Sequence, residues 1–191
     1  MPDDTHRISA LRAVAHPVRL QILSLLTGAD LSAAEIAREL NLTHANVSYH
    51  LKVLAGAGEV VEAGQEKIRG GIAKRYKHPW DRVESGPPAT DADRAGYFRA
   101  VADELVRRSA RRAPGGGNWL ADAEMWVEPA VWGKVISLVA EASLLLHAEA
   151  KPPRTPGTVH VNLTIAAFEM TDPSSGDRHA AESGRKVTDR E

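Results

Sequence analysis

The sequence contains no cysteine, which excludes disulfide bridges and every metal site that depends on thiolate ligands. Its charges nearly balance, with 24 lysines and arginines against 25 acidic residues and a net charge of −1, so any basic surface must be local. No uninterrupted apolar run reaches the roughly 18 residues of a membrane span. The opening residues MPDDTHRISA lack the apolar segment of a secretory signal. We therefore expect a cytoplasmic protein with no membrane partner.

The composition that remains is that of a globular protein. The chain has 191 residues, of which 43% are hydrophobic and 26% are charged. This length suffices for one full domain or two small ones, each with its own core.

Residues 8–26 carry apolar side chains at helical spacing, and Pro17 divides the run. Proline suits the first turn of a helix, so we expect one helix to end near Ala15 and a second to run from Pro17 to Thr27. Gly28 should end the second helix.

Two further helix starts follow. Ser32 and Glu35 form a capping-box pattern, and Thr43 is a favourable N-cap for the next helix. That last helix has apolar residues at i, i+4 and i+7, which should face inward: Val47, Leu51 and Leu54.

A β-hairpin is predicted next. Val60 and Val61 begin a strand, Gly70-Gly71 is typical of a turn, and residues 72–77 form the returning strand. Helices, a turn, a helix and then a hairpin make a winged helix-turn-helix.

The opening turns of the 43–54 helix are rich in hydrogen-bonding groups. A helix in the DNA major groove reads bases with such residues while its inner face stays packed. Thr43, His44, Asn46 and Tyr49 fall on the exposed side, whereas Ser48 and His50 flank the inward face. An N-capped surface helix facing water fits this pattern about equally well.

The hairpin adds a local excess of positive charge. Residues 67–77 hold five basic residues and no acidic one: Lys67, Arg69, Lys74, Arg75 and Lys77. Basic wings bind phosphates or enter the minor groove. Edge lysines that oppose aggregation are the alternative interpretation.

Residues 8–80 resemble the ArsR family of winged-helix transcriptional regulators. The similarity rests on LRAVAHPVRLQILSLL, on SAAEIARELNLTHANVSYHLKVLAGAGEV and on the wing. It implies a homodimer that binds an operator, usually as a repressor released by an effector. It also implies that Ser48 and His50, in the family's V-S-x-H-L segment, face DNA. The candidate DNA-binding residues are Thr43, His44, Asn46, Ser48, Tyr49, His50, Lys52, Lys67, Arg69, Lys74, Arg75 and Lys77.

Metal sensing is not expected. Family members that sense metals use a cysteine pair before the recognition helix, where this chain has LSAAEIAREL, or His and Asp on a dimer-forming helix. His147 and His160 lack a third clustered ligand. We predict no metal and no cofactor.

The second half should dimerise. After a linker at 84–93, a helix over 92–112 carries an apolar seam of Phe98, Val101, Ala102 and Leu105. A strand or an extended segment at 119–127, an apolar helix from Pro129 to about Ala148 and an alternating strand in TVHVNLTIAAF suggest a small strand-helix-strand unit, followed by a polar, disordered tail. The fold class is therefore α+β, with a DNA-binding domain at 1–83, a dimerisation and effector domain at 84–171 and a tail at 172–191.

Tryptophans concentrate in this second half. Trp119, Met125, Trp126 and Trp132 form core and dimer contacts in the simpler interpretation, or an aromatic-lined pocket for an apolar small-molecule effector.

No nucleophile-elbow, phosphate-loop or dinucleotide motif occurs, so we do not expect an enzyme. The sequence predicts a DNA-binding transcriptional regulator, a homodimeric repressor of a partly palindromic operator that ignores metals. A winged-helix protein-interaction module is the alternative.

Overall fold

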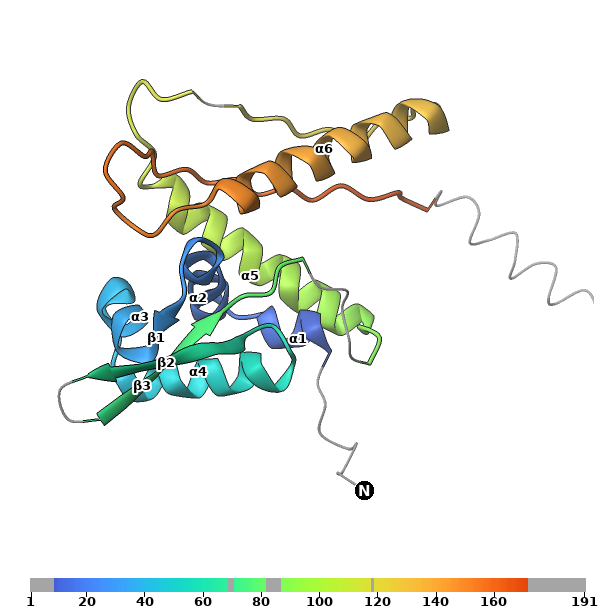
Figure 1. Ribbon diagram of the computed structural model, residues 1–191. Coiled ribbons are helices and arrows are strands. Elements are labelled where there is room, and N and C mark those ends of the chain that lie inside the picture. The colour runs from blue at the N-terminus through green and yellow to red at the C-terminus, as the bar shows by residue number, and fades with distance from the viewer. Residues whose placement is uncertain (1–8, 69–70, 82–86, 118, 172–191) are drawn as a thin grey trace, which may run out of the picture.

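The computed structural model describes residues 9–68, 71–81, 87–117 and 119–171. The elements are α1 (Ala10–Val14), α2 (Pro17–Gly28), β1 (Leu31–Ser32), α3 (Ala33–Leu40), α4 (His44–Gly56), β2 (Val61–Ile68), β3 (Gly71–Lys77), α5 (Asp91–Ser109) and α6 (Pro129–Glu149). Figure 1 shows α4 and the β2–β3 hairpin, hereafter the wing, on one side of the molecule and α6 on the opposite side, with α5 between them.

The helix boundaries in the first half follow the predicted caps. The Ser32 hydroxyl accepts the Glu35 backbone N–H at 3.3 Å, and the Glu35 carboxylate accepts the Ser32 backbone N–H at 2.7 Å. Asn41 ends α3 in the left-handed conformation, with a φ of 54°. The Thr43 hydroxyl then accepts the Asn46 backbone N–H at 3.2 Å and fixes the start of α4. The predicted helix-turn-helix is confirmed.

The sheet has three antiparallel strands in the order β1-β3-β2. The wing pairs from Val61 opposite Lys77 to Ile68 opposite Gly71. Sequence analysis missed β1, because two residues are too few for a periodic signal. Leu31 pairs with Tyr76 and Ser32 with Arg75, which joins the wing to the start of α3.

One apolar core holds this domain together. The side chains predicted to point inward from α4 lie within it, packed against α1, α2, α3 and the start of the wing. Its buried members are Val14, Ile22, Leu23, Leu26, Leu31, Ile36, Ala37, Val47, Leu51, Leu54 and Val60.

Helix α5 packs on α1 and α2. Its inner face buries Ala100 and Glu104 and places Tyr97 against the core. Glu104 is only 2% exposed, and it accepts hydrogen bonds from Gln21 at 2.6 Å and Arg107 at 2.6 Å. Although burial opposes ionisation, these bonds and the positive charges of Arg107 and Arg108 hold the Glu104 pKa below its ordinary value. The carboxylate therefore anchors α5 to α2.

The predicted seam lies on the other side of α5. Phe98, Ala102 and Leu105 are exposed, and Val101 is half-buried. Dimerisation through these residues stays a prediction.

The predicted strands of the second half do not form. Residues 119–128 and 158–171 are extended and make no sheet pairing, and turns at residues 153–157 separate the second segment from α6. The strand-helix-strand prediction is thus wrong for this structure, because an alternating segment becomes a strand only when a neighbour supplies its hydrogen bonds. We call residues 119–171 the C-terminal unit.

Helix α6 also corrects the expectation that no segment is long and apolar enough to span a membrane. It is the one described helix that is long and apolar enough to cross a membrane by length and composition, and none of that apolar stretch is buried. Lys134 and Glu141 interrupt its apolar letters, which is why the sequence shows no unbroken run.

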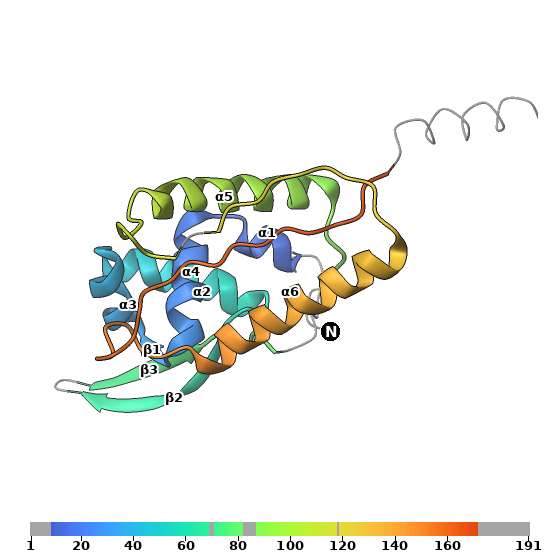
Figure 2. The ribbon, with the colours of Figure 1, turned by 90° about the horizontal axis from the view of Figure 1, so that it is seen from above.

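A few contacts hold the C-terminal unit on the rest of the molecule. The Trp80 and His147 rings lie 5.1 Å apart, and Arg154 forms an ion pair with Glu39 at 2.5 Å. The segment after Arg154 returns alongside α5 (Figure 2), where Arg108 donates to Asn162 at 3.0 Å and the Phe98 and Phe168 rings lie 5.8 Å apart.

Candidate nucleic-acid interface

The exposed side of α4 carries most of the residues predicted to read bases. Thr43, His44, Asn46 and Lys52 are exposed, and Tyr49 is 63% exposed. These side chains project from the opening turns of α4 because Val47, Leu51 and Leu54 fix the opposite face in the core. The helix N-terminus also carries a partial positive charge, which favours a nearby anion.

Ser48 sits at the edge of this surface. It is half-buried, and its hydroxyl lies 3.4 Å from Nδ1 of His44, one turn earlier in the helix. The pair can therefore present one continuous group of donors and acceptors.

His50 does not face outward, contrary to the prediction from the family resemblance. It is 6% exposed, and its ring lies 4.8 Å from the ring of His16 at the start of α2. Burial, then the charges of His16 and Arg19, lowers the pKa of His50. The buried imidazole therefore packs α4 against α2 in this structure.

His16 links this packing to the start of α2, so a proton on its ring would disturb both. Its Nδ1 accepts the Val18 backbone N–H at 3.2 Å and so caps α2. Burial, then the charge of Arg19, lowers the His16 pKa, which keeps the capping lone pair free.

Arg19 is a cation beside α4 that sequence reasoning missed. Burial lowers its pKa, the nearby Tyr49 phenol opposes that shift, and its guanidinium donates to the Arg12 carbonyl at 3.4 Å. Only its place in HPVRL, three residues after His16, could have indicated that it lies beside the recognition helix.

The basic residues of the wing divide into two groups. Lys67 and Lys77 are exposed and form no ion pair within the described residues, whereas Lys74 pairs with Glu62 at 2.9 Å. Arg69 lies outside the described residues. The free lysines are the better placed to meet phosphates.

Arg75 has a structural role that the sequence did not indicate. It pairs with Glu66 at 2.6 Å and Glu35 at 3.3 Å, and it donates to the Asp30 carbonyl. It thereby ties the wing to the start of α3. Neighbouring acceptors already engage its guanidinium, so a phosphate contact at Arg75 stays a prediction that requires it to leave them.

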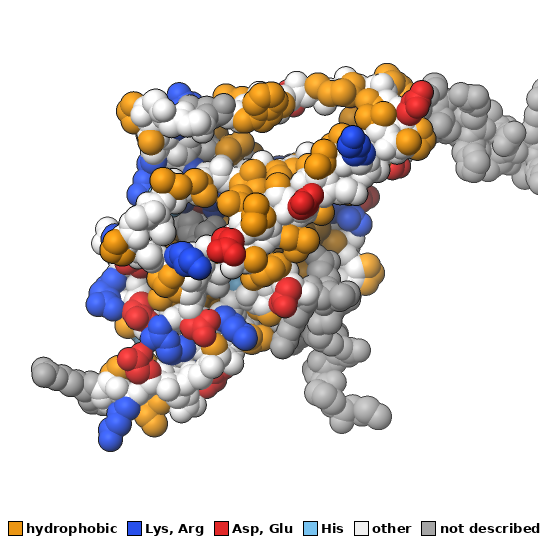
Figure 3. All heavy atoms as spheres, turned by 45° about the horizontal axis from the view of Figure 1, so that its top comes forward, with side chains coloured by type: hydrophobic (Ala, Val, Ile, Leu, Met, Phe, Trp, Pro, Cys, Tyr) orange, Lys and Arg blue, Asp and Glu red, His pale blue; other side chains and the backbone are white. Residues whose placement is uncertain are grey.

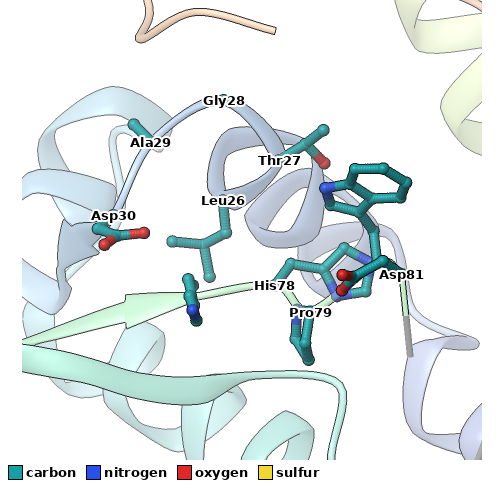
Figure 4. A pocket seen from close by; sticks show the side chains of 10 residues that line it. Leu26, Thr27, Gly28, Ala29, Asp30, His78, Pro79 and Asp81 are labelled. Carbon is teal, nitrogen blue, oxygen red and sulfur yellow. The ribbon is translucent and has the colours of Figure 1, made fainter. Parts of the chain in front are cut away.

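A cavity of about 490 Å³ lies at the root of the wing (Figure 4). Leu26 to Asp30, at the end of α2, line one side, and Lys77 to Asp81, where the chain leaves β3, line the other. Trp119 and Trp126, for which an aromatic-lined effector pocket was the alternative interpretation, are both exposed. Among the described residues, no group of three or more His, Asp or Glu side chains could hold a metal.

Comparison with known proteins is consistent with this geometry. Residues 14–61 match a family model described as a helix-turn-helix domain. The transcriptional repressor SdpR of Bacillus subtilis (strain 168) is 37% identical over 49 residues, which are 26% of this chain and 54% of the repressor. The chain thus spans about half the length of that relative.

Two solved structures also align with the chain. One is described as a possible transcriptional regulator for arsenical resistance, with 23% identity, 56% of this chain and 98% of that chain covered, and a TM-score of 0.32. The other is the multiple antibiotic-resistance repressor MarR from Listeria monocytogenes 4b F2365, with 13% identity, coverage of 72% and 82%, and a TM-score of 0.28. TM-scores this low do not establish a shared fold over the aligned lengths.

Proposed function

We propose that this protein is a DNA-binding transcriptional regulator that acts in the cytoplasm as a homodimeric repressor. The observation that supports it best is the exposed, polar opening of α4 beside the unpaired lysines of the wing. Asn46 and Tyr49 project from a helix whose opposite face is locked in the core. An amide can bond adenine through two hydrogen bonds, and lysines supply phosphate contacts.

A dimer follows from the small size of this surface. One recognition helix contacts only a few base pairs, which is too little for specific binding in a genome. Two copies of α4 about one DNA turn apart solve this problem and match a partly palindromic operator.

The regulator is proposed to ignore metals. A small-molecule effector is proposed to bind in the cavity at the wing root, where it would contact Lys77 at the end of β3.

A protein-interaction module is the second candidate. It is favoured by the ion pairs Lys74–Glu62 and Arg75–Glu66, which neutralise part of the wing that DNA binding would use.

One experiment separates the two. Purified protein is used to select bound duplexes from a random pool, and gel shifts are then measured on the selected sequence from about 50 to 200 mM salt. A regulator enriches a two-fold symmetric sequence and binds it less tightly as salt rises. A failure to enrich any sequence would favour the protein-interaction module.

A further inference from the structure

Helix α6 carries apolar side chains on several sides. The rest of the described chain packs against only one of them. Of its 21 residues none is buried. Trp132, Val139, Ser143 and His147 are half-buried and mark the side that faces the domain. A second row of apolar residues lies beside that side. Its members are alternately four and three residues apart, the spacing with which two helices pack against each other in a coiled coil. We call it the α6 seam: Val131, Val135, Leu138, Ala142 and Leu145.

The exposed apolar area is large enough for a stable interface. Trp119 and Trp126 are 89% and 87% exposed, which leaves roughly 300–400 Å² of indole surface in contact with solvent. The exposed aliphatic residues of α6 add an area on the order of 200–400 Å². Together they approach the roughly 800 Å² that each partner buries in a standard interface. Figure 3 shows hydrophobic side chains gathered over α6 and the segments beside it, while charged side chains gather over the helix-turn-helix domain.

We propose that a second copy of this chain covers this surface, with the two α6 helices packed antiparallel about a two-fold axis near Leu138. The proposal rests on the homodimer in the proposed function and assigns its interface. In this arrangement Val131 of each copy meets Leu145 of the other, and Leu138 meets its own equivalent.

The charges on α6 favour this partner. Lys134 and Glu141 lie seven residues apart beside the seam, so both fall on one line along the helix. A two-fold axis near Leu138 brings Lys134 of each copy opposite Glu141 of the other, which gives two ion pairs per dimer. A lipid bilayer would instead bury both charges in the middle of the helix without partners.

The same partner can complete the extended segments. Residues 159–165 alternate apolar and polar side chains without pairing to another strand in the described chain. Phe168 lies against Phe98, so the exposed apolar surface continues onto α5. An antiparallel neighbour from the second copy would supply the missing backbone hydrogen bonds.

Sedimentation equilibrium of the full chain without DNA tests the interface. We expect the wild type to be a dimer and the double variant Leu138→Asp/Leu145→Asp to be a monomer. Leu144→Asp is the matched control, since Leu144 is 56% exposed against 55% for Leu138 but points to another side of the helix. The control should remain a dimer. A monomeric wild type, or dissociation of the control as complete as that of the seam variant, would overturn the proposal.

Charge exchange tests the antiparallel geometry independently of folding. Lys134→Glu should weaken the dimer by roughly two- to tenfold, as expected for exposed pairs, and Lys134→Glu/Glu141→Lys should restore it. An unchanged dimer in the single variant, or no rescue in the double variant, contradicts the arrangement.

Two further measurements separate the outcomes. Flotation with phosphatidylcholine and phosphatidylglycerol vesicles should leave the wild type unbound, and co-flotation that Leu138→Asp abolishes would assign α6 to a membrane instead. Binding to random duplex DNA is measured on every variant. If no variant binds DNA but the seam variant alone is monomeric, the interface stands and the proposed function fails. If DNA binding is normal and the seam variant stays dimeric, the interface fails alone.

Discussion

Neighbouring residues of α4 perform opposite tasks. Tyr49 points into solvent, whereas His50, the next residue, packs against His16 in the interior. The helical turn of about 100° per residue separates the two side chains and lets one short segment carry both the surface and its support.

Base and phosphate contacts should respond differently to mutation. Asn46→Ala should cost roughly 1–3 kcal/mol on the operator and little on random DNA, because an amide reads a base edge. Lys67→Ala and Lys77→Ala should weaken all duplexes alike and reduce the salt slope by about one each. Gel shifts on both DNAs across a salt series measure this. Arg75→Gln serves as a contrast, because it should lower the free energy of unfolding and leave the salt slope of DNA binding nearly unchanged. Equal losses on random DNA for Asn46→Ala and the lysine variants would contradict these roles.

The stability of the protein should fall in mild acid. Burial lowers the pKa values of His16 and His50, so below about pH 6.5 the unfolded chain binds protons that the folded chain does not. The free energy of unfolding is therefore highest above that pH and decreases as the pH falls, by at most about 1.4 kcal/mol per pH unit for each group. Urea unfolding of the wild type and of His50→Gln at about pH 7.5 and 5.5 measures the effect.

The His50→Gln variant should lose less stability between the two pH values than the wild type. His78, whose pKa is also lowered by burial, titrates in the same window in both proteins, so the difference reports the His50 ring together with its effect on the adjacent His16. An identical pH dependence would show that His50 is not responsible.

At the scale of elements, α2 is the helix that the other parts of the chain contact: α4 at its start, α5 at its middle and the chain after α6 at its end. Its start is capped by His16 near α4, its middle accepts α5 through Gln21 and Glu104, and its end meets the chain after α6 at Gly28. Glycine is required there by space: a Cβ at residue 28 would lie 2.5 Å from the backbone oxygen of Lys151.

Gly28→Ala should therefore loosen the C-terminal unit and leave the helix-turn-helix folded. The added methyl group forces Lys151 away, at a cost of about 1–3 kcal/mol for overpacking. Hydrogen exchange of the Thr155 and Thr158 amides, which donate to the carbonyls of Pro152 and Thr155, reports the change. Gly56→Ala is the control, because a Cβ at this other helix end meets no atom within 4 Å. Equal exchange rates in the two variants would show that the Gly28 contact does not hold the unit.

On the scale of the whole molecule, the DNA-facing and apolar surfaces are separated. The wing and α4 occupy one side, and α6 with its flanking segments lies opposite (Figure 1). These C-terminal elements carry many of the exposed apolar residues. For the proposed dimer to bind two half-sites, its two-fold axis must bring both copies of α4 to one face, about one DNA turn apart.

A regulator built this way should not respond to metals. The chain has no thiolate, and the described residues bring no three His, Asp or Glu side chains together as ligands. Titration with zinc, nickel or cadmium should leave operator affinity within about twofold, and addition of a chelator should have no effect. A stoichiometric metal that shifts the affinity tenfold would contradict this expectation.

The sequence alone determined the helix-turn-helix and the wing. Its signals are local: a hydroxyl three residues before a carboxylate, a threonine cap, apolar residues at i, i+4 and i+7, and glycines at a turn. Each acts over one or two helical turns, so the hydrogen bonds of Ser32 and Thr43 and the buried face of α4 could be read before any tertiary contact was known.

Tertiary structure decided which polar residues remain free. His50 and Arg75 carry the same chemistry as exposed DNA contacts, yet His16 and the carboxylates of Glu35 and Glu66, distant in sequence, engage them. Whether segments 119–127 and 158–168 form strands also could not be read from local sequence. Strand formation depends on a neighbouring strand that the described chain does not supply. Alternation specifies which faces a strand would have, and only a partner in space makes it a strand.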